Sequence, residues 1–189
     1  MDGGRATEGG GILMYKLDKP YTDEEKLNFI VTHNYDNGRR IEETETCLYA
    51  LEDNEIMQDG VPIVNPDWDS IQLAQAKQDK IALNDELRDT ALLRGVTYNN
   101  VLFDSDTDQK ANIMGCVFTM SDEDTITWWG MDNQGLLCTK ADLIAIGGLI
   151  TELHSFCWGM NAYIKEQIQT AQTVEEIEAI EISYVRDDS

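Results

Sequence analysis

The chain has 189 residues, of which 42% are hydrophobic, so it can form a core and global disorder is not expected. It carries 14 Lys and Arg against 36 Asp and Glu, a net charge of −22. The negative electrostatic field of such a chain repels nucleic-acid phosphates and anionic lipid, so we expect no nucleic-acid partner. It favours basic protein partners or divalent cations, with simple solubility as the alternative explanation.

The cysteines do not form a metal-binding pattern. No two of them are spaced as a CxxC pair, so neither a zinc site nor another cofactor is expected. No charged leader precedes an apolar stretch and no apolar run approaches the roughly 20 residues that span a bilayer, so we expect no signal peptide and no membrane insertion. Isolated cysteines are usually buried thiols, and we expect this of Cys47, Cys116, Cys138 and Cys157.

The first third of the chain is expected to hold a leader and a small module. Residues 1–13 are rich in glycine and are expected to be a flexible leader. Residues 14–66 are expected to form a helix followed by a β-hairpin. Thr22 and Glu25 have the spacing of a capping box, which predicts the start of the helix, and the Asn and Gly residues of 34–38 predict its end.

The strands of this module are predicted from two signals. Threonine, leucine and tyrosine side chains between Thr44 and Leu51 indicate a strand. Asp59-Gly60 is typical of a hairpin turn, with Val61–Val64 as the second arm.

Residues 67–94 are expected to form a polar helix that links two modules. Its apolar positions are sparse and are interrupted by Gln78 and Lys80, so the helix would bury little by itself. The alternative is that it forms part of a weakly apolar helix bundle.

Residues 95–184 are expected to form a C-terminal domain of two β-hairpins packed on a long helix, so the fold class is α+β. Turn sequences predict the hairpins, and residues that can cap a helix precede each helical segment. The expected elements are a hairpin over 96–103 about Asn99-Asn100, a helix over 107–119, a hairpin over 125–138, a helix over 140–170 after a Thr139/Asp142 capping box, and a short helix after Thr173.

The long helix carries an apolar seam with heptad spacing. Its residues follow one another at intervals of three and four, the pattern in which one helix packs along another. The seam either covers the hairpins within one chain or pairs with copies of itself, as in a trimeric fibre. Its members are Leu143, Ile146, Ile150, Leu153, Cys157, Met160 and Ile164.

No arrangement of residues indicates catalysis, so we expect no enzyme activity. Catalysis needs a nucleophile, a base or a metal within mutual reach, and His33 and His154 lie far apart within helical patterns. Asp104, Asp106 and Asp108 alternate as at the start of a calcium-binding loop. The glycine and the bidentate acid that complete such a loop are missing, so helix capping is the better explanation.

Trp128 and Trp129 are the candidate contact residues. Adjacent residues of a strand face opposite sides, so one tryptophan can lie in the core while the other is exposed. An exposed tryptophan could bind a sugar ring or a protein partner, and packing of both under the long helix is the alternative.

Several motifs of the second half of the chain occur together in a fixed order. They are G-V-x-Y-N at Gly95–Asn99, F-D-S-D within Phe103–Ile113, the tryptophan strand, T-x-x-D-L at Thr139–Leu143 and T-x-E-E-I at Thr173–Ile177. In this order, about residues 85–184 resemble a domain of unknown function found at the C-terminal end of phage tail-fibre and tail-associated proteins. The stretch KPYTDEEKLNFIVTHNYDNGRRIEETETCLYALEDNE is similar to N-terminal modules of prophage tail-region proteins.

The resemblance implies a setting rather than a reaction. It implies a structural component of a bacteriophage tail or tail fibre, placed in the virion tail and, during assembly, in the host cytoplasm. Other tail or fibre proteins are the expected partners, and a homo-oligomer is expected, with a trimer favoured. The alternatives are a tail-fibre assembly chaperone and a receptor-binding tip that recognises a host surface glycan.

Overall fold

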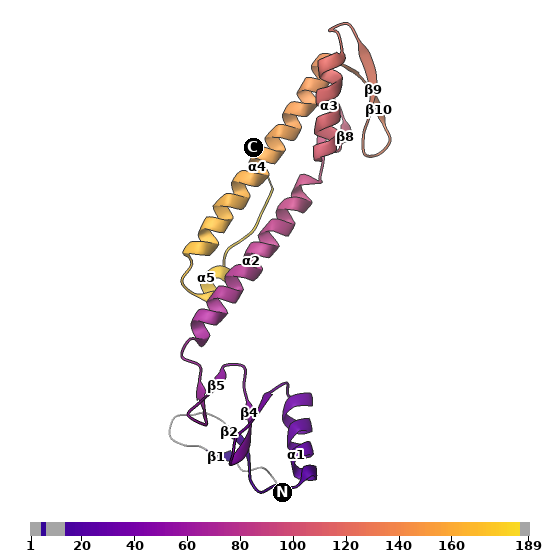
Figure 1. Cartoon of the computed structure of the whole chain (residues 1–189). Helices are drawn as coiled ribbons and strands as arrows, with labels where there is room; N and C mark the ends of the chain where they lie inside the picture. The colour runs from indigo at the N-terminus through magenta and orange to yellow at the C-terminus, as the bar shows by residue number, and fades with distance from the viewer. Residues whose placement is uncertain (1–4, 7–13, 186–189) are drawn as a thin grey trace. The chain divides into compact units, whose positions relative to one another are not determined.

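The computed structural model describes residues 5–6 and 14–185. The leader expected over residues 1–13 therefore lies outside the described residues, except for Arg5 and Ala6. The chain divides into two compact units, Met1–Gln72 and Leu73–Ser189. Both units contain helices and antiparallel strands (Figure 1), which confirms the expected α+β class.

The first unit is built on a four-stranded antiparallel sheet. In the order of the sheet, its strands are β1 (Arg5–Ala6), β2 (Met14–Asp18), β4 (Cys47–Leu51) and β3 (Arg40–Glu43). Every residue of β4 is buried because other elements cover both faces of the strand. The strand at β4 was predicted, whereas β2 and β3 were not.

Helix α1 (Asp23–Ile30) and the π-helical segment η1 (Val31–Tyr35) that follows it cover one face of this sheet. The predicted capping box is present: the backbone N–H of Glu25 donates to the Thr22 hydroxyl over 3.2 Å, and the Thr22 N–H donates to the Glu25 carboxylate over 2.8 Å. Phe29 is the buried residue of α1 and packs in one cluster with the residues of β4 that face it. The helix is thus fixed by its cap and by the packing of Phe29 and Ile30.

The predicted hairpin of the first unit is formed by β5 (Glu55–Gln58) and β6 (Val61–Val64). Asp59 and Gly60 at its turn have φ values of 53° and 81°, which the left-handed conformation of a type I′ turn requires. Met57 packs against the other face of β4.

Helix α2 (Trp68–Leu92) belongs to the second unit from Leu73 onward and packs there against α4 (Lys140–Thr170), as Figure 1 shows. Ala91 is buried in the shared cluster, and Ile81 and Leu87 are partly buried against it. For this part of α2 the structure favours a helix pair over a linking helix, because these three apolar residues pack in the cluster shared with α4.

The remaining elements of the second unit lie where the sequence predicts them. Asn99 and Asn100 have φ values of 47° and 63°, which confirms the type I′ hairpin. The elements are β7 (Val96–Tyr98), β8 (Val101–Phe103), α3 (Thr107–Thr119), β9 (Thr125–Trp129), β10 (Gly135–Thr139), α4 after its Thr139–Asp142 capping box, and α5 (Val174–Glu178).

The apolar seam predicted on α4 is used inside the chain. Its N-terminal half packs against the two hairpins and α3, and its C-terminal half packs against α2 and the C-terminal segment that contains Tyr184. Self-association through these positions would require the core to open, so the first of the two interpretations describes the seam. Leu143, Ile146, Ile150, Cys157 and Ile164 are buried, and Leu153 and Met160 are partly buried.

Helix α4 is long and apolar enough, by length and composition alone, to cross a membrane, although no membrane-spanning segment was predicted from the sequence. A core helix meets the same criterion. The buried seam accounts for one part of the apolar character of α4, and an exposed face, described below, accounts for the other.

Candidate functional site

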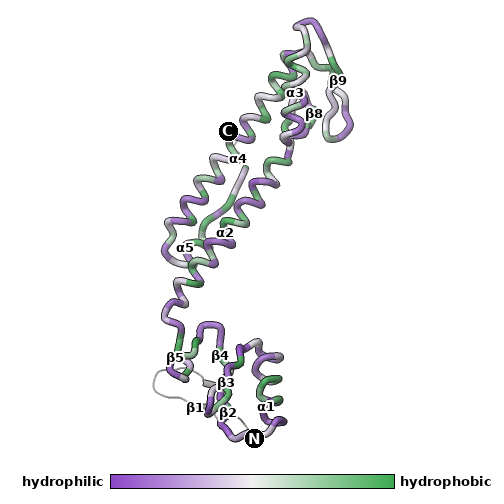
Figure 2. The backbone as a smooth tube through the Cα atoms, viewed as in Figure 1, coloured by the Kyte–Doolittle hydropathy of each residue, from purple (hydrophilic) through white to green (hydrophobic). Residues whose placement is uncertain are grey.

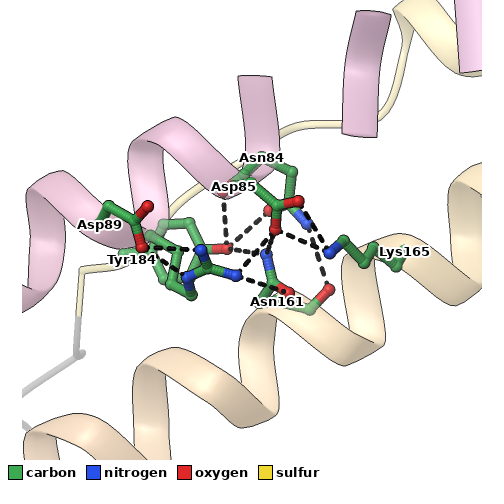
Figure 3. Close-up of polar contacts among 7 residues, drawn as sticks. Asn84, Asp85, Asp89, Asn161, Lys165 and Tyr184 are labelled. Atoms are coloured by element: carbon green, nitrogen blue, oxygen red, sulfur yellow. Dashed lines mark hydrogen bonds and ion pairs between the residues drawn. The ribbon is translucent and has the colours of Figure 1, made fainter. Parts of the chain in front are cut away.

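A polar network joins α2, α4 and the C-terminal segment within the second unit (Figure 3). The side-chain amide of Asn84 donates to the backbone carbonyl oxygen of Asn161 over 3.1 Å. The Tyr184 hydroxyl donates to the side-chain oxygen of Asn84 over 2.6 Å. The Asn161 amide donates to Asp85 over 2.9 Å and to the Tyr184 hydroxyl over 3.2 Å. Asn84, Asn161 and Tyr184 are buried, and such groups are stable in a core when they pair with one another.

Charged residues surround this network. The amino group of Lys165 lies 2.7 Å from the carboxylate of Asp85, and its hydrogen bond is the main reason that the pKa of Asp85 is lowered. The Arg88 guanidinium binds Asp85 over 2.8 Å and Asp89 over 2.7 Å, and it lies 4.2 Å from the ring centre of Trp158. These charged groups form ion pairs and hydrogen bonds with one another, so the network stabilises the packing of α2 against α4.

Of the three alternating aspartates, Asp106 caps α3 as predicted, and Asp108 lies in the first turn of the helix. The side chain of Asp106 accepts a hydrogen bond of 2.6 Å from the backbone N–H of Gln109. The buried hydroxyl of Ser105 donates to the carbonyl oxygen of Leu92 and accepts from the N–H of Gly95 over 3.2 Å. Among the described residues, no group of three or more His, Cys, Asp or Glu is placed to hold a metal ion.

Both histidines are engaged in packing. Nε2 of His154 lies 2.7 Å from the carbonyl oxygen of Ser105. The ring of His33 lies 4.8 Å from that of Tyr15 and 4.5 Å from that of Phe29, and burial lowers the pKa of His33. All four cysteines are reduced, as predicted; Cys47, Cys138 and Cys157 are buried, whereas Cys116, also expected to be buried, is only partly so.

Trp128 and Trp129 lie on opposite sides of the β9–β10 hairpin, as strand alternation predicts. Trp128 packs against the core, and its indole N–H is buried without a hydrogen-bond partner among the described residues. Trp129 is 62% exposed, and its ring lies beside Gly135, its partner across the hairpin. It borders a hollow of about 550 Å³ between the hairpin and α3, which Gln109 and Asn112 also line. Trp128 also lines this hollow, and Trp129 is the more exposed of the two tryptophans.

Helices α3 and α4 form an apolar groove of about 400 Å³ on the surface of the second unit. Three of its large side chains are strongly exposed: Phe118 by 92%, Met114 by 62% and Ile144 by 55%. Gly147 and Gly148 leave part of its α4 wall without side chains. Hydrophobic residues recur along both helices in Figure 2. An exposed apolar surface of this kind usually marks a binding site.

The groove is free of acidic residues. Neither 109–121 nor 143–151 contains an Asp or Glu, although the chain has 36 of them. Lys110 lines the groove, and its amino group forms no hydrogen bond or ion pair with any other described residue. Each other described Lys or Arg of the second unit binds a carbonyl or carboxylate oxygen: Lys77, Lys80, Arg88, Arg94, Lys140 and Lys165.

This groove was not predicted from the sequence. Its signal is present in α3, where Ile113, Met114, Val117 and Phe118 spread over too wide an arc for one contact with α4 to bury. An apolar arc wider than the available contact must leave large side chains exposed.

Residues 75–183 match the family model of a domain of unknown function, DUF4376. The match covers more than half of the chain and contains the groove and most of the polar network. The chain therefore belongs to the DUF4376 family, which confirms the expected domain of unknown function. No curated protein and no solved structure matches the chain.

Proposed function

We propose that the protein is a structural component of a bacteriophage tail or tail fibre that acts by binding other proteins and has no catalytic role. The observation that carries the proposal is the apolar groove between α3 and α4, in which Phe118 is 92% exposed. Such a side chain gains stability when a partner covers it. The phage setting is supported by the ordered motifs that resemble tail-associated proteins, from Gly95–Asn99 to Thr173–Ile177.

The proposed partners are other tail or fibre proteins and further copies of the chain. The net charge of −22 opposes contact with nucleic acid and favours basic partner surfaces where a partner meets the acidic surface outside the groove. The proposed location is the virion tail, with the host cytoplasm as the place of assembly.

Quantitative mass spectrometry of purified particles tests the structural role. Peptides of the chain are measured in gradient-purified particles of the phage that encodes it and in the particle-free lysate. A structural component is expected in the particles at a constant ratio to the other tail proteins. Its presence in the lysate and absence from the particles would contradict the structural role and favour the assembly chaperone.

A glycan-binding tip is the second candidate, because Trp129 is 62% exposed beside Gln109 and Asn112. An aromatic ring can pack on the apolar face of a sugar ring, and amide groups can form hydrogen bonds with its hydroxyl groups. Titration of host surface polysaccharide into the native protein and a Trp129→Ala variant tests this candidate. Weaker binding by the variant supports it, whereas no binding by either protein contradicts it.

A further inference from the structure

The outer face of α4 carries a second row of residues with heptad spacing, distinct from the buried seam. The intervals are again three and four, and the row spans about 33 Å at 1.5 Å per residue. All its members are exposed and uncharged: Ala141, Ile144, Gly148, Thr151, Ser155, Trp158 and Ala162. We call this row the outer face of α4.

We propose that the outer face of α4, together with the groove beside it, binds a second copy of the chain. The two α4 helices run antiparallel. Their two-fold axis crosses the outer faces at the level of Leu153 along the helix. The groove and the outer face form one continuous surface, because Ile144, Gly148 and Thr151 belong to both.

The antiparallel register places large residues opposite small ones. Gly148 lies opposite Trp158 of the second copy, and Ile144 lies opposite Ala162 of the second copy. In a parallel pair each residue would meet its own equivalent, so that two Trp158 rings would collide and two Gly148 would leave a void. Close packing without voids therefore favours the antiparallel pair, whose two-fold axis makes the contact self-complementary.

The groove has room for Trp158 of the second copy. A Cβ atom added at Gly148 would meet nothing within 4 Å, so the space beside this glycine is open. Phe118 and Met114 border the same groove and can contact an indole ring. The Arg88 guanidinium lies 4.2 Å from the centre of the Trp158 ring, and the ring remains 52% exposed.

Charge indicates why the partner is a second copy. Two chains of charge −22 repel each other, so contact through surfaces without acidic residues is favoured. A basic partner would instead favour the acidic surfaces. The outer face has no acidic member, and the acid nearest its centre is Glu152, which lies beside the row. A face of this length also needs a long helix as partner, and α4 is one.

This inference does not depend on the phage setting. It replaces the trimer expected from the sequence with a two-fold pair, because the residues that suggested a trimer are buried in the core.

Light scattering on the full chain over a range of concentrations tests the pair. We expect twice the chain mass for the native protein. Gly148→Arg is expected to weaken the pair by about 30-fold or more, because a charged side chain would fill the space for Trp158. Gly115→Arg is the matched control, since Gly115 is also an exposed helical glycine with nothing near its Cβ position, and it is expected to pair like the native protein. A monomer at all concentrations, a trimer, or a pair insensitive to Gly148→Arg would overturn the inference.

Cysteine cross-linking tests the register. Ile144→Cys and Ala162→Cys chains are prepared separately in a Cys116→Ser background, mixed and mildly oxidised. The antiparallel register predicts cross-links between the two different chains and none within either preparation alone. Cross-links within the Ile144→Cys preparation would indicate a parallel pair and overturn the register.

Discussion

The side-chain amide of Asn84 on α2 donates a hydrogen bond of 3.1 Å to the backbone carbonyl oxygen of Asn161 on α4. Both residues are buried, and they lie 77 positions apart in the chain. A polar pair in the contact between two helices fixes their register more strictly than apolar contacts do, because its atoms must meet at hydrogen-bond distance. The helix pair of the second unit is therefore set by amides as well as by its apolar cluster.

Replacing Asn84 with leucine tests this role. The Asn84→Leu variant removes the acceptor that the Tyr184 hydroxyl uses at 2.6 Å and leaves buried polar groups short of partners. We expect the free energy of unfolding to fall by about 2–3 kcal/mol. Urea unfolding followed by circular dichroism measures it. The exposed Asn112→Leu is the control and is expected to change stability by no more than about 0.5 kcal/mol. Equal stability of the two variants would show that the network is dispensable.

Much of the second unit could be predicted because its signals are local. The turn at Asn99-Asn100 and the capping box at Thr139–Asp142 involve residues within three positions of each other. Their geometry follows from φ preference and backbone hydrogen bonding, so these elements were placed close to their actual bounds.

The non-local parts could not be predicted in this way. Strands β2 and β3 depend on pairing with β4, and their own residues mix charged and apolar side chains. The packing of α2 against α4 was predicted only as the alternative, because Asn84, a buried contact, is read as a surface residue in any hydrophobicity pattern.

The candidate site was predicted only in part. Alternation along β9 correctly separated a core tryptophan from an exposed one, but it could not tell which was which. The buried seam and the uncharged outer face of α4 share the same spacing, so periodicity alone could not decide which of the two faces the core. The tertiary contacts of the buried row, from Leu143 to Ile164, decide it.

A close backbone contact at Gly130 gives a second prediction. A Cβ atom at this position would lie 2.6 Å from the carbonyl oxygen of Leu102 and 2.6 Å from a methyl group of Val101. The Gly130→Ala variant is expected to lose about 2 kcal/mol, since β8 would have to shift. Gly115→Ala is the control and is expected to gain up to about 1 kcal/mol, because its Cβ position is open and alanine favours a helix. Thermal unfolding of both variants measures the difference, and a fully stable Gly130→Ala protein would contradict the contact.

The turn of the β7–β8 hairpin gives a third prediction. Asn100 has a φ value of 63°, a conformation that costs glycine nothing and costs β-branched residues most. We expect Asn100→Gly to raise the free energy of unfolding by about 0.5 kcal/mol and Asn100→Val to lower it by about 1–2 kcal/mol. The urea concentrations at the unfolding midpoints of the two variants show whether Asn100→Gly is the more stable and Asn100→Val the less stable. The opposite order would show that the Asn100 side chain, rather than its backbone conformation, stabilises the turn.

The Glu43 carboxylate of the first unit gives a fourth prediction, concerning pH. It accepts hydrogen bonds from Lys26 over 2.7 Å and from Tyr21 over 2.6 Å, and Lys19 lies 3.2 Å away. These contacts, that of Lys26 first, lower the pKa of Glu43 to about 2, while the hydrogen bond to Glu43 raises the pKa of Tyr21 to about 12.

The direction of the pH effect follows from these values. An unfolded chain has a glutamate pKa of about 4.3, so the stabilisation from Glu43 is complete above that pH and is lost as the pH falls toward about 2. The stabilisation from Tyr21 is complete below about pH 10 and is lost as the pH rises toward about 12. Carboxyl NMR titration measures the Glu43 midpoint directly. A Glu43→Gln variant should lose less stability than the native protein between about pH 4.3 and 2, and a native midpoint near 4.3 would show that the three contacts do not persist in solution.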